Sequence, residues 1–208
     1  MKTHTELLQI ADRIRAIARN GQFYALNEYD KERYDELLDL SNRLTATLTN
    51  TEIETVAACY TPATDYVTPK VDIRAVVFDD KERILMVRER ADGKWSLPGG
   101  WGDVGFSPGE VAVKEVREET GYEVTPMRLL AILDMSRHNH PPTPHYTYKI
   151  FIRCTLTGGA PQTAFDTLDV GFFTLDALPP LSAERVTREE IELMYDFLHN
   201  PHKEAITD

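Results

Sequence analysis

The sequence predicts an α+β protein in which helices pack on a mixed sheet and a small helical domain precedes them. Residues 1–50 carry apolar residues at helical spacing, whereas five strand-like runs and two helical segments follow residue 70. The chain has 208 residues, of which 42% are hydrophobic, enough for one ordinary domain and a smaller appendage. Between residues 57 and 70 the pattern is irregular and contains two prolines. We therefore expect domains at residues 1–66 and 67–208.

The first domain is expected to be a pair of helices. Thr3 and Glu6 have the form of a capping box at the start of the first helix, and Gly21 stands where its C-terminal cap would lie. The second helix is expected from about residue 29 to about residue 48. Each helix has one apolar stripe, and two helices alone bury little surface. The helical pair must therefore dock on a second copy of the protein or on the main domain, and we prefer the second copy.

The second domain is expected to contain the sheet. Strand-like runs occupy residues 71–78, 83–89, 127–135, 145–156 and 170–175. One helix is expected in the acidic segment after Ser107, and a second after Thr187, where Glu190 completes a capping box. Two of the expected strands precede the first of these helices, and the other three lie between the two helices. We therefore expect a mixed sheet with helices packed on it.

Composition excludes several functional classes. The formal net charge is −11, which disfavours binding to nucleic acid or to an anionic membrane and favours a site that needs cations. The two cysteines, Cys59 and Cys154, lie far apart without CxxC spacing, as expected in a reducing compartment. Charged residues interrupt the apolar residues near the N-terminus, so we expect neither a secretory signal nor a membrane span. These observations predict a cytosolic protein.

The acidic helix concentrates negative charge on one side. Ser107, Pro108 and Glu110 have the pattern of a helix start, and Gly121 suits the left-handed residue after its end. At 100° per residue, one arc of about 100° holds three carboxylates, those of Glu115, Glu118 and Glu119. The adjoining arc is apolar and is expected to face the core; it holds Ala112, Val113 and Val116.

Clustered carboxylates on a capped helix indicate a metal site. Like charges at i,i+4, as in Glu115 and Glu119, destabilise a helix, and a divalent cation removes the repulsion. Mg2+ and Mn2+ prefer oxygen ligands. Three carboxylates and a backbone carbonyl of the preceding loop, residues 97–106 (the glycine loop), would supply them. The alternative, a solvated acidic face, needs neither the Gly-Gly pair nor the sharp caps.

The segment resembles the signature of the Nudix hydrolases. The matching residues are Gly100, Glu115, Val116, Glu118, Glu119, Gly121 and Tyr122. Phe106 replaces the first Glu of the signature and Lys114 replaces its Arg, so the loop loses an ion pair while the metal ligands are kept. We expect Lys114 to pair with Glu110 instead, and Phe106 to pack under the loop.

The resemblance implies a Nudix α/β/α sandwich from about residue 67 and Mg2+-dependent hydrolysis, with Mn2+ as a substitute. Glu115 and Glu119 would bind the metal with the carbonyl of Gly99, and Glu118 would be a further ligand or the base. The substrate would be a nucleoside diphosphate linked to another group, X. Over nearly the whole chain the sequence is similar to the bacterial group that cleaves CDP-choline and ADP-ribose, in which the helical extension implies a homodimer.

Two arginines and two tryptophans are considered for contacts with the substrate. Arg74 and Arg88 lie on the first two strands and could bind phosphate oxygens, or could equally tie strand ends to acidic loops. Trp95 and Trp101 bracket the glycine loop, where an aromatic face could hold a quaternary ammonium; packing in the core or as a platform is the preferred interpretation for both.

Two loops complete the candidate site. The segment SRHNHPPTPH, which contains His138 and His140, suits a rigid loop that shapes a pocket, or a surface loop with incidental histidines. Asp166 and Asp169 flank the loop before the last strand, and either could be the general base or a turn former. A non-catalytic Nudix-fold sensor that uses the helical pair as its output is the alternative function, although it does not explain why all three carboxylates are retained.

Overall fold

The structure is a computed structural model that describes residues 2–60, 66–143 and 145–208. The chain divides into two compact units, Met1–Pro69 with Pro142–Tyr146, and Lys70–Pro141 with Thr147–Asp208. Among the described residues, no helix has both the length and the apolar character needed to cross a membrane.

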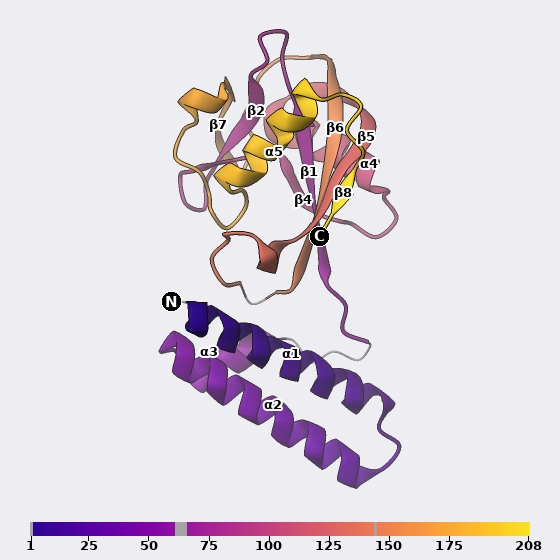
Figure 1. Ribbon diagram of the computed structural model, residues 1–208, viewed down its shortest axis with the longest axis vertical. Coiled ribbons are helices and arrows are strands. Elements are labelled where there is room, and N and C mark those ends of the chain that lie inside the picture. Colours follow the sequence, from indigo (N-terminus) through magenta and orange to yellow (C-terminus); the bar gives the residue numbers. More distant parts are fainter. Residues whose placement is uncertain (1, 61–65, 144) are drawn as a thin grey trace. The chain divides into compact units, whose positions relative to one another are not determined.

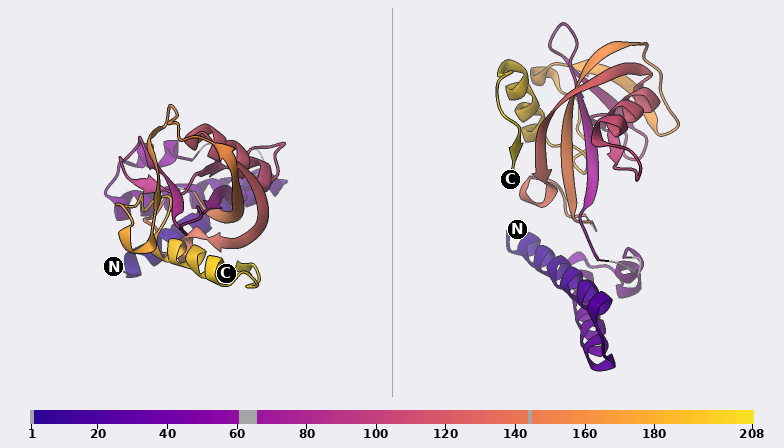
Figure 2. Two further views of the ribbon diagram at one scale, coloured as in Figure 1. Left: turned by 90° about the horizontal axis from the view of Figure 1, so that it is seen from above. Right: turned by 90° about the vertical axis from the view of Figure 1, so that its right-hand side faces the viewer.

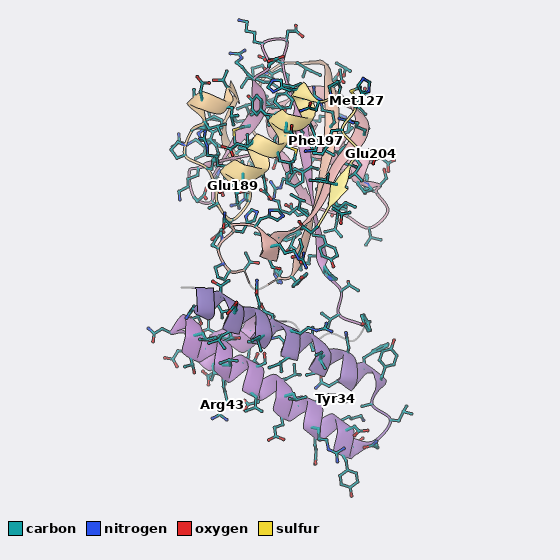
Figure 3. The ribbon with its side chains drawn as sticks, viewed as in Figure 1. Tyr34, Arg43, Met127, Glu189, Phe197 and Glu204 are labelled. Atoms are coloured by element: carbon teal, nitrogen blue, oxygen red, sulfur yellow. The ribbon has the colours of Figure 1, made fainter. Side chains whose placement is uncertain are left out.

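The N-terminal unit contains the expected pair of helices, α1 (Lys2–Tyr24) and α2 (Glu28–Thr49), and a short helix, α3 (Ile53–Ala58), that was not expected (Figure 1). The expected ends of the first helix are wrong, because α1 begins before Thr3 and continues past Gly21. Gly21 is needed instead for packing, since a Cβ there would lie 2.2 Å from the ring of Tyr34, which Figure 3 labels on α2. A glycine can therefore mark close helix packing rather than a helix end.

The second unit contains two sheets. Its strands are β1 (Lys70–Val77), β2 (Ile84–Glu89), β3 (Trp95–Ser96), β4 (Gly99–Trp101), β5 (Tyr122–Asp134), β6 (Thr147–Gly159), β7 (Thr167–Phe173) and β8 (Ile206–Thr207). In the described part of the chain, one sheet has the order β4-β1-β6-β5-β8 and the other β3-β2-β7. Strand β1 pairs parallel with β6 and antiparallel with β4, which confirms the expected mixed sheet.

Two helices cover the strands from opposite sides, as Figure 2 shows for α4 (Pro108–Thr120) and α5 (Arg188–His199). Alternate residues of β1 pack on the two faces of the sheet, because successive side chains of a strand point to opposite faces. Ile73 and Ala75 pack in the cluster that contains Val116 of α4, whereas Val76 packs in the cluster that contains Ile191 of α5. Two helical layers around a mixed sheet confirm the expected α/β/α sandwich.

The strands differ from the expectation in their bounds, most of all for β5, and in three short strands that were not expected. Strand β5 begins at Tyr122, directly after Gly121 ends α4, rather than at Met127. Strands β3, β4 and β8 were missed because two or three residues are too few for an alternating pattern to be visible. The glycine loop that leads to α4 is therefore partly an edge strand, hydrogen-bonded to β1.

Candidate active site

The acidic helix has the expected boundaries. The side-chain oxygen of Ser107 accepts from the amide of Glu110, and the carboxylate of Glu110 accepts from the amide of Ser107, which confirms the capping box. Gly121 has φ of 72°, so the left-handed C-cap is also confirmed. Val111, Ala112 and Val116 are fully buried, and their packing fixes which residues of the helix face the glycine loop.

Glu119 is the most deeply buried carboxylate of the acidic helix, with only 5% of the residue exposed. Its Oε2 accepts a hydrogen bond of 2.9 Å from the amide of Gly99. Burial raises the pKa of Glu119 to about 8; the positive charge of Arg74 and the Gly99 amide act in the opposite direction, whereas Glu89 and Glu115 raise it further. Ionised Glu119 therefore needs more positive charge than the nearby side chains provide.

Gly99 and Gly100 bring the loop backbone against these carboxylates. A Cβ on Gly99 would lie 2.0 Å from the carbonyl oxygen of Ile73, and its φ of 151° disfavours side chains. A Cβ on Gly100 would lie 3.3 Å from the carboxyl carbon of Glu115, whose pKa burial also raises. Gly99 thus allows a close backbone approach that other residue types do not permit, whereas a side chain at Gly100 would need the carboxylate of Glu115 to shift slightly.

Glu118 lies apart from the other two carboxylates. Its side chain is 59% exposed, and the ammonium of Lys114 lies 3.7 Å from it, 3.4 Å from Glu115 and 3.1 Å from Asp103. The expected pair of Lys114 with Glu110 is wrong, because Glu110 is held by Ser107. Phe106 is 51% exposed, so its expected packing under the loop is also wrong.

The donor atoms at this helix suit a hard divalent cation. Among the described residues, no group of three or more His, Cys, Asp or Glu side chains is arranged to hold a metal ion, and Lys114 lies between two of the expected ligands. The observations that favour a cation are the raised pKa of buried Glu119 and the space beside Glu115 that a Cβ on Gly100 would fill. Carboxylate and backbone oxygens are the ligands that Mg2+ and Mn2+ prefer.

Arg74 is buried rather than directed at solvent. Its guanidinium donates two hydrogen bonds, of 2.9 and 2.8 Å, to Asp72 and a third of 3.0 Å to the carbonyl of Leu97. The side chain is 7% exposed. Burial opposes its charge, but Asp72 and the more distant Glu119 outweigh burial and raise the pKa of Arg74. Of the two roles considered from the sequence, this geometry corresponds to a link between β1 and the glycine loop.

Arg88 and Trp101 are more accessible. Arg88 is exposed on β2, and its Nε donates to the carbonyl of Gly93. Trp101 is 51% exposed at the end of β4, and the ammonium of Lys70 lies 5.2 Å from the centroid of its ring. Trp95 packs edge-to-face against Phe173 at 4.7 Å beside the buried core, as the packing interpretation for Trp95 expected.

The two histidines anchor their loop to different elements. His138 Nε2 lies 3.2 Å from the carboxylate of Asp208. His140 is almost fully buried, with Nδ1 2.7 Å from the carbonyl of Ala183 and Nε2 3.0 Å from the carboxylate of Glu190. His140 is therefore buried among specific contacts, whereas His138 is partly exposed.

Asp166 and Asp169 lie on either side of the start of β7. The backbone carbonyl of Asp166 accepts from the amide of Arg90, and its side chain is exposed. Asp169 is paired in register with Arg88, and its carboxylate accepts from the amide of Val170. Between them, the hydroxyl of Thr167 donates to the carbonyl of Glu119, so the start of β7 is next to the end of the acidic helix.

Sequence analysis missed the buried charges around the site. Glu89 is 8% exposed, accepts from Ser96 Oγ at 2.6 Å and lies 3.3 Å from Arg185. Asp72 and Lys149 are also buried. The available signal was a charged residue inside or at the end of an apolar strand run, which periodicity alone does not separate from a solvent-facing position.

The fold and the carboxylate helix behind a glycine loop define the class, and the chain belongs to the Nudix family. The family model described as the NUDIX domain matches residues 68–196. A second family model, described as a UDP-X-like, N-terminal oligomerisation domain, matches residues 5–60. The resemblance stated from the sequence is thereby confirmed, and the protein is a Nudix pyrophosphohydrolase.

Relatives cover the whole chain. The protein is 45% identical over 208 residues, 100% of both chains, to YjhB of Bacillus subtilis (strain 168), which is named provisionally as an ADP-ribose pyrophosphatase. The crystal structure of a UDP-X diphosphatase is 34% identical and covers 99% of each chain with a TM-score of 0.64. That of an ADP-ribose pyrophosphatase from Streptococcus suis is 44% identical, with a TM-score of 0.62, and covers 68% of this chain and 100% of its own.

The raised pKa of Glu119 predicts how metal-free protein responds to pH. The folded-state pKa is about 8 and the ordinary value is 4.5, so between these values the folded protein keeps a proton that the unfolded chain has lost. The free energy of unfolding is therefore expected to fall as pH rises from about 5 to about 8. Thermal unfolding in EDTA across this range tests it. The Glu119→Gln variant should show a shallower fall, and equal slopes in both proteins would contradict the assignment.

Proposed function

We propose that the protein hydrolyses the pyrophosphate bond of a nucleoside diphosphate linked to another group, with Mg2+ as cofactor and Mn2+ as a possible substitute. ADP-ribose and CDP-choline are the preferred candidate substrates. The products would be a nucleoside monophosphate and a phosphorylated partner. The observation that carries the proposal is buried Glu119, which is hydrogen-bonded to Gly99 and has a raised pKa, on a helix whose Glu115 lies beside Gly100 of the same loop.

In this proposal Glu115, Glu119 and the carbonyl of Gly99 hold the cation, with Glu118 as a further ligand or as the base. A bound divalent cation neutralises the pyrophosphate and lowers the pKa of a water molecule. Glu118 suits the acceptance of a proton because its side chain is 59% exposed and can move. Asp166 is the alternative base, since it is exposed one residue before Thr167, which contacts the end of the acidic helix.

Contacts with the substrate are proposed for the accessible residues around the glycine loop. Trp101 offers a half-exposed aromatic face to a base or to choline, and Arg88 an exposed guanidinium to phosphate. His138 and His140 would act by holding the shape of their loop, because Nε2 of His138 and both ring nitrogens of His140 already contact protein groups. For Arg74 we now propose support of the loop instead of direct contact, since its side chain is 7% exposed.

The proposal is tested by product analysis on a panel that contains ADP-ribose, CDP-choline and UDP-linked sugars, each with Mg2+, with Mn2+ and with EDTA. We expect nucleoside monophosphate to form only when a divalent cation is present. Reaction in 18O-labelled water would show which phosphorus is attacked. No turnover on any member would contradict an enzymatic role and favour a nucleotide-binding sensor, which isothermal calorimetry with the same nucleotides would then detect.

We also propose that the protein forms a homodimer through α1 and α2. The family model for this region is described as an oligomerisation domain, and exposed apolar residues recur on α1 at helical spacing, with Ile10 50% and Ile17 48% exposed. Both cysteines of the chain are free thiols, which suits a reducing, cytosolic location.

The dimer is tested by placing charge on the apolar surface of α1. Replacing Ile10 and Ile17 together by Glu is expected to convert the assembly to monomers, because burying two unpaired charges in an interface costs more than the contact provides. Light scattering after size-exclusion chromatography measures the mass. Thr47→Glu, at an exposed polar position on α2, is the control that should leave the mass unchanged. A dimer that persists in the double variant would exclude this surface.

A further inference from the structure

A chain of buried charged residues runs from the start of α5 to the glycine loop. Its members Asp72, Arg74, Lys149 and Glu190 are each at most 6% exposed. We propose that Glu190 is a positioning residue for the pyrophosphatase reaction. Glu190 holds Lys149, so that Lys149 does not pair with Asp72. Asp72 therefore stays bonded to Arg74, which keeps Arg74 from pairing with Glu119. This inference rests on the proposed function of the Glu119 site.

Glu190 connects three parts of the domain at the start of α5. Its carboxylate accepts from the ammonium of Lys149 at 2.8 Å and from the amide of Thr187 at 2.9 Å, and lies 3.0 Å from His140. Its neighbour Glu189 points away at the surface, as Figure 3 shows at the start of the helix. The hydrogen bond of His140 and the charge of Lys149 outweigh burial and lower the pKa of Glu190 to about 2, so the residue is a permanent anion near neutral pH.

Lys149 is a fully buried cation with two carboxylates within its reach. It lies on β6, in register with Asp72 on the parallel strand β1, so their side chains stand on the same face of the sheet. Its ammonium also donates to the carbonyl of Arg185 at 2.5 Å. Burial lowers the pKa of Lys149, and the negative charges of Glu190 and Asp72 oppose that shift; Glu190 is the carboxylate in direct contact.

Asp72 and Arg74 connect these buried charged residues to the glycine loop. Asp72 receives both of its hydrogen bonds from the guanidinium of Arg74, which in turn donates to the carbonyl of Leu97. Two residues further on, the amide of Gly99 donates to Glu119. Arg74 is also paired in register with Gly99, the residue whose amide binds Glu119, so the charge of Arg74 lies near Glu119 although its guanidinium is bonded to Asp72. Arg74 thus stands between two carboxylates and is held by one of them.

Loss of the charge on Glu190 would change which carboxylate holds Arg74. The buried ammonium of Lys149 would then find its remaining anion in Asp72, because an unpaired charge in a low-dielectric interior is strongly unfavourable. Asp72 would be shared between two cations, and Arg74 would be freed to pair with Glu119. A metal ligand paired with an arginine binds a divalent cation poorly, since the two cations repel each other and compete for the same oxygens.

The inference predicts that two variants that break the same ion pair differ in activity. Glu190→Gln should lower kcat/KM about 10- to 100-fold and weaken Mn2+ binding, whereas Lys149→Met should lower both much less, because it removes the cation that displaces Arg74. The double variant Lys149→Met/Glu190→Gln should recover most of what Glu190→Gln loses. Glu192→Gln, on the same helix but half-exposed, is the control and should match the wild type.

Three measurements on the full-length protein separate positioning from general destabilisation: kcat and KM on the substrate found in the panel, Mn2+ affinity by calorimetry, and hydrogen exchange at the Gly99 amide. All are made well below the lowest melting temperature of the set. A purely structural role predicts that activity follows stability, so equal losses in Glu190→Gln and Lys149→Met, or no rescue in the double variant, would overturn the inference. If the wild type hydrolyses nothing, the proposed function fails, while Mn2+ affinity and Gly99 exchange still test the coupling.

Discussion

Replacing Glu119 by Gln is expected to reduce kcat/KM by about 1000-fold while the protein remains folded. Gln has nearly the same shape and can still accept the hydrogen bond from the Gly99 amide, but it lacks the charge that would hold a cation. Because burial already favours the neutral form of Glu119, neutral Gln should not destabilise the metal-free protein near pH 8. The expected phenotype is therefore a stable, inactive protein with weakened binding of Mg2+ or Mn2+.

Steady-state kinetics, calorimetry with Mn2+ and thermal unfolding check this result. Glu123→Gln is the matched control, because Glu123 is an exposed carboxylate just beyond the end of the same helix and should tolerate the substitution. Retention of more than a tenth of wild-type activity in Glu119→Gln would mean that the cation is held elsewhere. Unfolding of the variant would instead mean that Glu119 is a structural residue.

Gly99→Ala is expected to have the second largest effect, through the backbone. The new Cβ would lie 2.0 Å from the carbonyl oxygen of Ile73 and 3.0 Å from the Cα of Arg74, so β4 would have to move away from β1. Overpacking against rigid backbone, together with an unfavourable φ, is expected to cost roughly 3 kcal/mol of stability. Because the Gly99 amide binds Glu119, activity should fall about 100-fold even where the protein is folded.

Gly102→Ala is the control for this substitution. Gly102 belongs to the same loop, but a Cβ there would meet Val71 at 3.5 Å, which is ordinary van der Waals contact. Denaturant unfolding and kinetics on both variants separate a close backbone approach from a general need for glycine. Equal behaviour of the two variants would show that β4 can shift without affecting the acidic helix.

Much of this fold could be predicted from the sequence, because local patterns determine where helices and strands begin and end. The caps at Ser107 and Gly121 and the capping box of Thr187 and Glu190 were found in the expected places. The error at Gly21 has a physical reason. A glycine after a run of helical residues can end a helix or can let a tyrosine ring pack closely against it, and the sequence does not distinguish the two.

The candidate site could be predicted only in part. The spacing of Glu115, Glu118 and Glu119 placed three carboxylates on one side of a helix, but helical geometry does not say how deeply each one is buried. The structure buries Glu119, leaves Glu118 59% exposed and positions Lys114 between Glu118 and Glu115. These differences arise because the end of the helix packs against Gly99 and Thr167, which are 20 and 48 residues away in the sequence.

The sequence by itself determined the order of the longer helices and strands, the caps of α4, the start of α5, the net charge and the carboxylate helix behind two glycines, since each depends on residues close together in the chain. Only the tertiary structure decided that Arg74 is bound to Asp72, that His140 is anchored to Glu190 and that Lys149 is fully buried beside Glu190. Burial and charge pairing depend on which strands lie side by side, and the parallel register of β1 with β6 is set by packing over the whole sheet.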